Sequence, residues 1–194
     1  MTTPPLFSAV VLAAGRSARM GREKALLETG GGPLWQRQRD LLAQLGAAEI
    51  FLSVRPEQAW ARSAPGFTAR LHDVLPDCGP IGGLTAALER AAHPHVVVLA
   101  VDLPRMTAAW LETLLAGRTE DCGAVGRRDG FFEPLAALYP KALMPLAWEA
   151  LARGDYALQP LLAAGVAQGF LRVQEIDAAT APQFENWNEP SAQA

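Results

Sequence analysis

Val10-Val-Leu-Ala-Ala-Gly-Arg-Ser-Ala-Arg-Met-Gly-Arg-Glu-Lys24 carries the clearest signal of the fold in this sequence. Its apolar start predicts a strand over residues 8–13, and Gly15 opens a loop with three arginines before Lys24. A helical pattern over residues 34–45 follows just after Pro33. This order of strand, basic loop and helix is typical of open α/β sheets, which bind anionic ligands at the carboxyl ends of their strands.

The basic loop differs from two familiar phosphate-binding motifs. Gly15 does not lead into the Gly-Lys-Ser/Thr of a Walker loop, and it does not begin a Gly-x-Gly-x-x-Gly dinucleotide fingerprint. An ordinary strand-to-helix loop with surface arginines is the alternative interpretation. However, basic side chains crowd this loop, and Lys24 and Lys141 are the two lysines of the whole sequence. Both facts favour the binding of an anion.

Composition indicates one globular domain without affinity for nucleic acid or membranes. The chain has 194 residues, of which 50% are hydrophobic and 19% charged, and its net charge is −3. The negative charge argues against polyanionic partners, and no apolar stretch reaches the length of a transmembrane helix. Cys78 and Cys122 form neither a disulfide framework nor a metal motif. We therefore expect reduced thiols and a cytoplasmic protein.

Strand-like apolar runs alternate with helical patterns along the rest of the chain, and no linker divides it. The alternation predicts an α/β fold with a mostly parallel sheet covered on both faces. The further expected strands are residues 49–54, 68–73, 95–101, 123–126, 135–139 and 170–175. The further expected helices are residues 56–62, 84–92, 108–116, 141–152 and 158–164. Residues 127–134 are expected to form a loop.

Asp102 is the most informative acidic residue. It follows six apolar residues, 96–101, which predict a buried central strand, and Pro104 then turns the chain away. A carboxylate at the carboxyl end of such a strand can bind Mg²⁺, which commonly takes one or two protein carboxylates together with water and substrate phosphates. Helix capping is the alternative, but the next expected helix begins after Thr107, too far downstream for a direct cap.

Other candidate residues follow neighbouring strands. Ser53 offers a hydroxyl, and Asp73 can accept hydrogen bonds from a base or ribose or else form an Asx turn. The Gly-Pro-Ile-Gly-Gly segment at 79–83 permits close approach of a base or a second anionic substrate, or is a simple tight turn. Arg127-Arg128 can receive a phosphate or form a solvated surface. Because no nucleophile elbow or Cys–His pattern occurs, phosphoryl or nucleotidyl transfer fits these residues best.

Together these residues resemble the molybdenum cofactor guanylyltransferases, within the wider MobA-like group of nucleotidyltransferases. The matching segments run in order along nearly the whole chain. They are Leu12-Ala-Ala-Gly-Arg-Ser-Ala-Arg-Met-Gly21 with Lys24, Pro33-Leu34, Asp73, Gly79-Pro-Ile-Gly-Gly83, Val101-Asp-Leu-Pro104, Glu133-Pro-Leu135 and Asn186-Trp-Asn-Glu-Pro190. The resemblance implies a single three-layer α/β/α domain of the nucleotide-diphospho-sugar transferase type. Its nucleotide-binding half would span about residues 1–105 and its acceptor-binding half about residues 106–194.

The resemblance also implies roles for individual residues. Arg19, Lys24 and Asp102 would be catalytic, with Asp102 as the ligand of Mg²⁺, the expected cofactor. The residues implied to contact the nucleotide are Leu12, Ala13, Ala14, Gly15, Lys24, Ser53, Asp73 and Asp102. Those implied to contact the acceptor are Gly82, Arg127, Asn186 and Asn188. The implied reaction transfers GMP from GTP to molybdopterin, or to its molybdenum-bound form, and releases pyrophosphate.

Ala14 keeps the identity of the base open. Guanylyltransferases usually have glycine at this position, and an Ala-Ala-Gly loop is also typical of molybdopterin cytidylyltransferases. A cytidylyltransferase, or an enzyme that joins an NTP to a sugar phosphate, is therefore the alternative. A nucleotide-binding chaperone of molybdoenzymes is the non-enzymatic alternative, and the set of Arg19, Lys24 and Asp102 argues against it. The expected partners are GTP and molybdopterin, with room for transient contact with molybdoenzymes or their chaperones.

Overall fold

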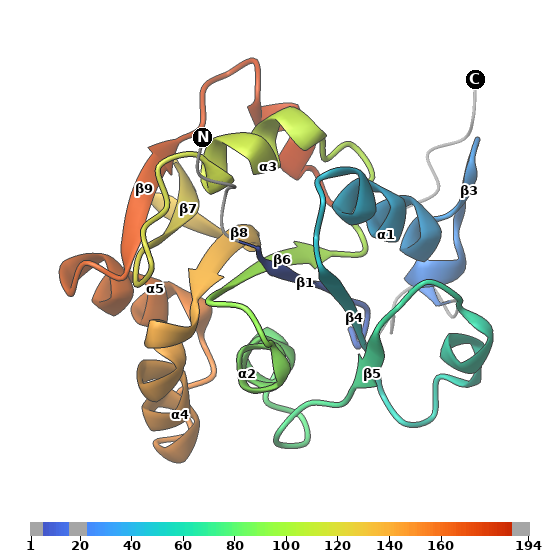
Figure 1. Cartoon of the computed structure of the whole chain (residues 1–194), viewed down its shortest axis with the longest axis horizontal. Coiled ribbons are helices and arrows are strands. Elements are labelled where there is room, and N and C mark those ends of the chain that lie inside the picture. Colours follow the sequence, from blue (N-terminus) through green and yellow to red (C-terminus); the bar gives the residue numbers. More distant parts are fainter. Residues whose placement is uncertain (1–5, 16–22, 188–194) are drawn as a thin grey trace.

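A mostly parallel sheet forms the centre of the protein, as the alternating pattern predicts. The computed structural model describes residues 6–15 and 23–187. In this part of the chain, seven strands form one sheet in the order β5-β4-β1-β6-β8-β7-β9 (Figure 1). The strands are β1 Ser8–Leu12, β4 Glu49–Ser53, β5 Ala69–Leu71, β6 His95–Ala100, β7 Gly123–Arg128, β8 Phe131–Pro140 and β9 Leu171–Glu175. Strand β8 pairs antiparallel with β6 and β7, whereas the other neighbours are parallel.

Helices cover both faces of this sheet (Figure 1). They are α1 Leu34–Gln44, α2 Pro80–Arg90, α3 Ala108–Leu115, α4 Met144–Ala152 and α5 Leu158–Ala167. The buried side chains of α1 and α3 pack on one face, and those of α2, α4 and α5 pack on the other. A short antiparallel hairpin precedes α1, and each of its strands, β2 Glu28–Thr29 and β3 Gly32–Pro33, has two residues. The three-layer α/β/α fold class is therefore confirmed.

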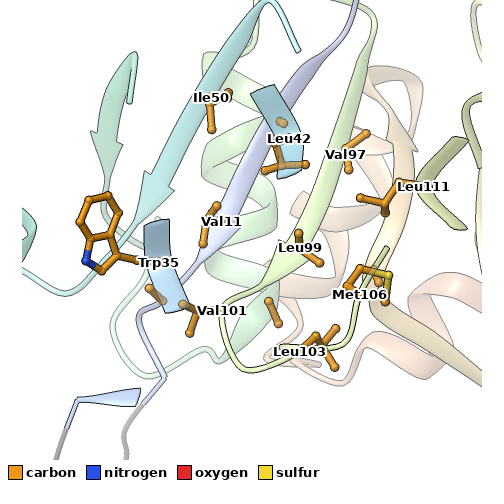
Figure 2. Close-up of a cluster of buried hydrophobic side chains, with 14 of the residues drawn as sticks. Val11, Trp35, Leu42, Ile50, Val97, Leu99, Val101, Leu103, Met106 and Leu111 are labelled. Atoms are coloured by element: carbon orange, nitrogen blue, oxygen red, sulfur yellow. The ribbon is translucent and has the colours of Figure 1, made fainter. Parts of the chain in front are cut away.

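The two central strands are buried on both sides. Val11 of β1 and Leu99 of β6 belong to the cluster under α1 and α3, which Figure 2 shows together with Leu42 and Leu111. The adjacent Val10 belongs to the cluster under α2, because successive side chains of a strand point to opposite faces. Each such aliphatic side chain contributes about 1.5–3 kcal/mol through burial. The carboxyl ends of β1 and β6 are therefore held in a rigid core.

Helix α2 begins earlier than predicted. Residues 79–83 were expected to form a loop, but the helix begins at Pro80, and Gly79 precedes it with a φ of 69°. Proline is favoured in the first helical turn because its missing N–H has no partner there and its φ suits a helix. The glycines therefore bring the start of α2 close to the sheet instead of forming an open turn.

The prediction of a loop over residues 127–134 is wrong. Strands β7 and β8 continue through this segment and are joined at Asp129-Gly130, whose φ values are 51° and 82°. Asp-Gly is a sequence signal for a tight hairpin turn, and the turn requires positive φ values at both residues. The signal was present, but the charged and proline-containing flanks concealed the strands.

Three helical predictions also need correction. Residues 56–62 contain only a 3-10 turn, Ala59–Ser63, because Gln58 has a non-helical ψ of 78° and places its amide on the Ala13 carbonyl. Residues 141–143 are likewise a 3-10 turn ahead of α4. Helix α5 continues three residues past its predicted end, through Gly165. An added Cβ there would lie 2.7 Å from Leu143, so this glycine permits close packing.

Candidate active site

A pocket of about 640 Å³ lies at the carboxyl ends of β1, β4, β5 and β6. The last residues of these strands and the segments that follow them line the pocket, namely residues 12–15, 53–57, 72–73 and 100–102, together with Lys24 and the start of α2. Parallel strands end at the same edge of a sheet, which explains why segments far apart in sequence meet here. All the described residues expected to contact a nucleotide line this pocket. They are Leu12, Ala13, Ala14, Gly15, Lys24, Ser53, Asp73 and Asp102.

Lys24 and Asp102 form an ion pair in the pocket. The Lys24 Nζ lies 2.9 Å from the Asp102 Oδ2, and the two side chains are 22% and 20% exposed. Lys24 begins a short 3-10 turn. Asp102 is the second residue after β6, which ends at Ala100. The backbone of Asp102 is fixed as well, since its carbonyl accepts a hydrogen bond from the Trp187 N–H at 2.9 Å. A rigid strand end thus presents a partly accessible carboxylate and ammonium to the same space.

Ser53, Asp73 and Gly83 form a second, more buried part of the pocket. Burial raises the pKa of Asp73, although the Ser53 hydroxyl, His72 and Arg55 act in the opposite direction. Ser53 is 1% exposed, and its Oγ makes no hydrogen bond of regular geometry to any described residue. A Cβ on Gly83 would lie 2.6 Å from that Oγ, so glycine is required for α2 to approach. The pocket therefore contains a buried hydroxyl and a half-buried carboxyl, both of which line the space for a polar ligand.

The described residues among those expected to bind the acceptor, Gly82, Arg127 and Asn186, do not line the pocket. Gly82 lies behind Asp73, because an added Cβ would be 2.9 Å from the Asp73 Cβ and 2.3 Å from the Cys78 sulfur. Arg127 pairs with Glu175 of β9, with an Nε–Oε1 distance of 2.9 Å. Asn186 is exposed. The other two expected residues, Arg19 and Asn188, lie outside the described residues.

Sequence reasoning missed Arg55, Gln58 and Glu23. The Arg55 guanidinium donates to the Gly15 carbonyl at 2.8 Å and to Glu23 at 3.0 Å, and Gln58 donates to Glu23 at 2.6 Å. The signal available in the sequence was position alone: Arg55 directly follows the predicted strand over residues 49–54, and Glu23 precedes Lys24. Their mutual contacts span more than thirty residues of sequence and follow from the fold.

Side chains that could bind a metal ion do not form a cluster in the described part of the chain. No group of three or more His, Cys, Asp or Glu side chains within residues 6–15 and 23–187 could hold a metal ion. Asp102 nevertheless matches the requirement of Mg²⁺, for which one carboxylate suffices when water and substrate phosphates supply the other ligands. The pocket beside it has room for such a ligand.

Residues 9–170 match the family described as the MobA-like NTP transferase domain. The chain belongs to this family. It is 38% identical over 183 residues to a probable molybdenum cofactor guanylyltransferase of Opitutus terrae, covering 93% of this chain and 89% of that protein. It is 31% identical over 192 residues to a molybdenum cofactor guanylyltransferase of Pseudomonas entomophila, covering 97% of each. The predicted resemblance and the assignment as a nucleotidyltransferase are confirmed.

Solved structures agree on the fold of this MobA-like chain. Molybdopterin-guanine dinucleotide biosynthesis protein A from Archaeoglobus fulgidus superposes with a TM-score of 0.72 at 22% identity, covering 95% of this chain and 93% of that one. A 2-C-methyl-D-erythritol 4-phosphate cytidylyltransferase from Thermus thermophilus gives 0.69 at 19% identity, covering 95% and 94%. Among the described residues, no helix has the length and apolar character needed to cross a membrane.

Proposed function

We propose that this protein transfers GMP from GTP to molybdopterin or its molybdenum-bound form and releases pyrophosphate. The observation that carries the proposal is the pairing of Lys24 with Asp102 in a pocket built from four strand ends. A cation for phosphate and a carboxylate for Mg²⁺ are the two charged groups that nucleotidyl transfer requires. The names of the relatives from Opitutus terrae and Pseudomonas entomophila support GTP and the molybdenum cofactor as substrates.

In this proposal the nucleotide lies along the loop after β1. Leu12, Ala13 and Ala14 surround the base and ribose, with Gly15 next to the phosphates. Ser53 and Asp73 contact the nucleoside, which is supported by their place in the pocket and by the buried Ser53 Oγ without a hydrogen bond of regular geometry. Lys24 contacts the phosphates together with Arg19, which lies outside the described residues.

Asp102 would hold Mg²⁺, which fits a single partly exposed carboxylate at a strand end. When bound, the ion would offset negative charge on the phosphates of the nucleotide. Lys24 would exchange its bond with Asp102 for bonds to the phosphates, because the phosphate oxygens would replace the carboxylate as the anionic partner of the ammonium. The ion pair would thus keep both groups in position before the nucleotide binds.

The chemical step needs no covalent enzyme intermediate. The terminal phosphate oxygen of molybdopterin would attack the α-phosphorus of GTP and form the new P–O bond. The bond from the α-phosphorus to the bridging oxygen would break, and its electron pair would leave with pyrophosphate. Lys24 and Arg19 would stabilise the charge on the leaving group, and the pocket would hold the two reactants in line.

The acceptor would bind beside this pocket, mainly in the half of the chain from about residue 106. The proposed contacts are Arg127, Asn186 and Asn188 of that half together with Gly82 of α2, and the described ones lie outside the lining of the nucleotide pocket. Transient contact with molybdoenzymes or their chaperones would follow product formation. A cytoplasmic location is part of the proposal, and the two free cysteines, Cys78 and Cys122, support it.

Pyrophosphate release tests the proposal. The protein is incubated with Mg²⁺ and each of the four NTPs, with and without molybdopterin. We expect release that needs both GTP and molybdopterin. Release with CTP instead would favour the cytidylyltransferase alternative that Ala14 suggests. If no NTP gives release that depends on molybdopterin, the proposed reaction is wrong.

A further inference from the structure

The turn that follows β4 is hydrogen-bonded to the chain on both sides of residues 16–22. Arg55 donates through Nη1 to the carbonyls of Ala14 and Gly15, at 2.5 and 2.8 Å, and through Nη2 to the Glu23 carboxylate at 3.0 Å. Gln58 donates to the Ala13 carbonyl at 3.1 Å and to the second Glu23 oxygen at 2.6 Å. The same turn therefore fixes residues 13–15 and Glu23.

These bonds set the direction of two backbone amides. In a trans peptide the carbonyl of one residue and the N–H of the next point in opposite directions. Gln58 donates to the Ala13 carbonyl and Arg55 to the Ala14 carbonyl. The N–H groups of Ala14 and Gly15 therefore point away from these two side chains. Neither N–H has a hydrogen-bond partner among residues 6–15 and 23–187, and both residues line the pocket. Successive backbone N–H groups in a loop after a strand are suited to an anionic ligand.

The same bonds also restrict Lys24. Glu23 directly precedes it, and both carboxylate oxygens of Glu23 are engaged, one by Arg55 and the other by Gln58. Lys24 in turn reaches Asp102 across the pocket at 2.9 Å. Holding Glu23 therefore limits the positions from which the Lys24 ammonium can meet a phosphate.

The Arg55 guanidinium is occupied by these bonds. It contacts Ala14, Gly15 and Glu23, and its Nε donates to Glu57 at 2.8 Å. A guanidinium holds several acceptors at once because its donors lie in a planar fork, whereas a lysine ammonium is a single point charge on a flexible stem. The Arg55 side chain is 19% exposed, so most of its contacts are with the protein and few are with solvent.

We propose that Arg55, through Glu23 and Gln58, is the positioning residue that orients the Ala14 and Gly15 amides and Lys24 for the nucleotide. This inference rests on the proposed function, since it assigns the pocket to an NTP. It predicts that loss of Arg55 weakens nucleotide binding while leaving acceptor binding nearly unchanged. If Arg55 only stabilised the fold, its loss would instead lower Tm and weaken the binding of both substrates to a similar extent.

Arg39 provides a matched control. It is 17% exposed, donates to a loop carbonyl at Pro65 with a distance of 2.9 Å, and pairs with Asp40. It therefore resembles Arg55 in exposure and bonding, but it does not line the pocket. Replacing each arginine by methionine removes the same kind of contacts at two different places.

The experiment compares wild type, Arg55→Met, Arg55→Lys, Glu23→Gln and Arg39→Met. Calorimetric titration with GTP and Mg²⁺ gives the nucleotide Kd, pyrophosphate release gives the KM of each substrate, and thermal melting gives Tm. We expect Arg55→Met to raise the Kd and KM for GTP by about 10²-fold, the scale of a small misplacement of binding groups. The KM for molybdopterin should change by less than about threefold. Arg55→Lys should retain part of the nucleotide affinity.

Combining Arg55→Met with Glu23→Gln should raise the Kd for GTP by less than the product of the single effects, because both act through one network. If Arg55→Met does not fold, Arg55→Lys and Glu23→Gln decide the question. A Kd for GTP in these variants equal to that of Arg39→Met would overturn the positioning role while leaving the proposed function intact. If wild type binds none of the four NTPs, both proposals are wrong.

Discussion

Replacing Asp102 by asparagine separates the stability of the fold from the proposed chemistry. The side chain keeps its shape, and the hydrogen bond from the Trp187 N–H to the Asp102 carbonyl is untouched. The substitution removes the charge that pairs with Lys24 at 2.9 Å, where the two side chains are 20% and 22% exposed. Both side chains are mostly covered, so losing the charged hydrogen bond should cost about 1–3 kcal/mol of stability. Tm should therefore fall by about 2–12 °C for a chain of this length.

Turnover should fall much further. If Asp102 holds Mg²⁺ beside the phosphates, loss of its charge should lower kcat by about 10²- to 10³-fold, as when one charge-stabilising group is removed from an active site. The assay is pyrophosphate release from GTP with molybdopterin, over a range of Mg²⁺ concentrations, with thermal melting in parallel. Asp40→Asn is the control, since it likewise removes the carboxylate partner of a cation, here Arg39 on the surface of α1. A kcat for Asp102→Asn within about threefold of that control would refute the metal role.

Three further predictions test the local geometry. Gly83→Ala would place a Cβ 2.6 Å from the Ser53 Oγ, so it should cost about 1–3 kcal/mol of stability and raise the KM for GTP, as unfolding and kinetics would show. Because burial raises the pKa of Asp73 above its ordinary 3.8, the native state binds this proton more tightly than the unfolded state, and stability is lost as pH rises through the raised pKa. Asp73→Asn should therefore raise Tm at pH about 7 and not at pH about 3, while weakening GTP binding; an equal effect on Tm at both pH values would contradict this. Gly130→Ala should cost about 1–2 kcal/mol, because its φ is 82°, with no change in the KM for GTP; unchanged stability would refute the strain argument.

The sequence predicted the sheet and the place of the site because both depend on local patterns. Six apolar residues ahead of Asp102 are enough to indicate a buried strand whose end carries a carboxylate, and the structure has β6 there. The basic loop after β1 and the polar ends of β4 and β5 follow from the same rule. Residues such as Ser53 and Asp73 could therefore be assigned to one edge of the sheet from the sequence.

Contacts between distant side chains could not be predicted in this way. Lys24 and Asp102 are 78 positions apart, and their pairing depends on how the fold brings the turn at Lys24 to the segment after β6. Arg55 looked like an ordinary charged residue in a loop, because its partners, the carbonyls of Ala14 and Gly15, carry no side-chain signal. The extension of β7 and β8 through the Asp129-Gly130 turn was missed for a different reason, since polar residues on an exposed hairpin resemble a loop.

The fate of the α-phosphate tests the central claim most directly. The protein is incubated with Mg²⁺, molybdopterin and GTP labelled at the α-phosphate, and the products are separated and identified by mass. The proposed reaction predicts that the label moves into a molybdopterin guanine dinucleotide, with one pyrophosphate released for each product formed. Label that remains in GTP, or that appears in GDP or free GMP irrespective of molybdopterin, would contradict it.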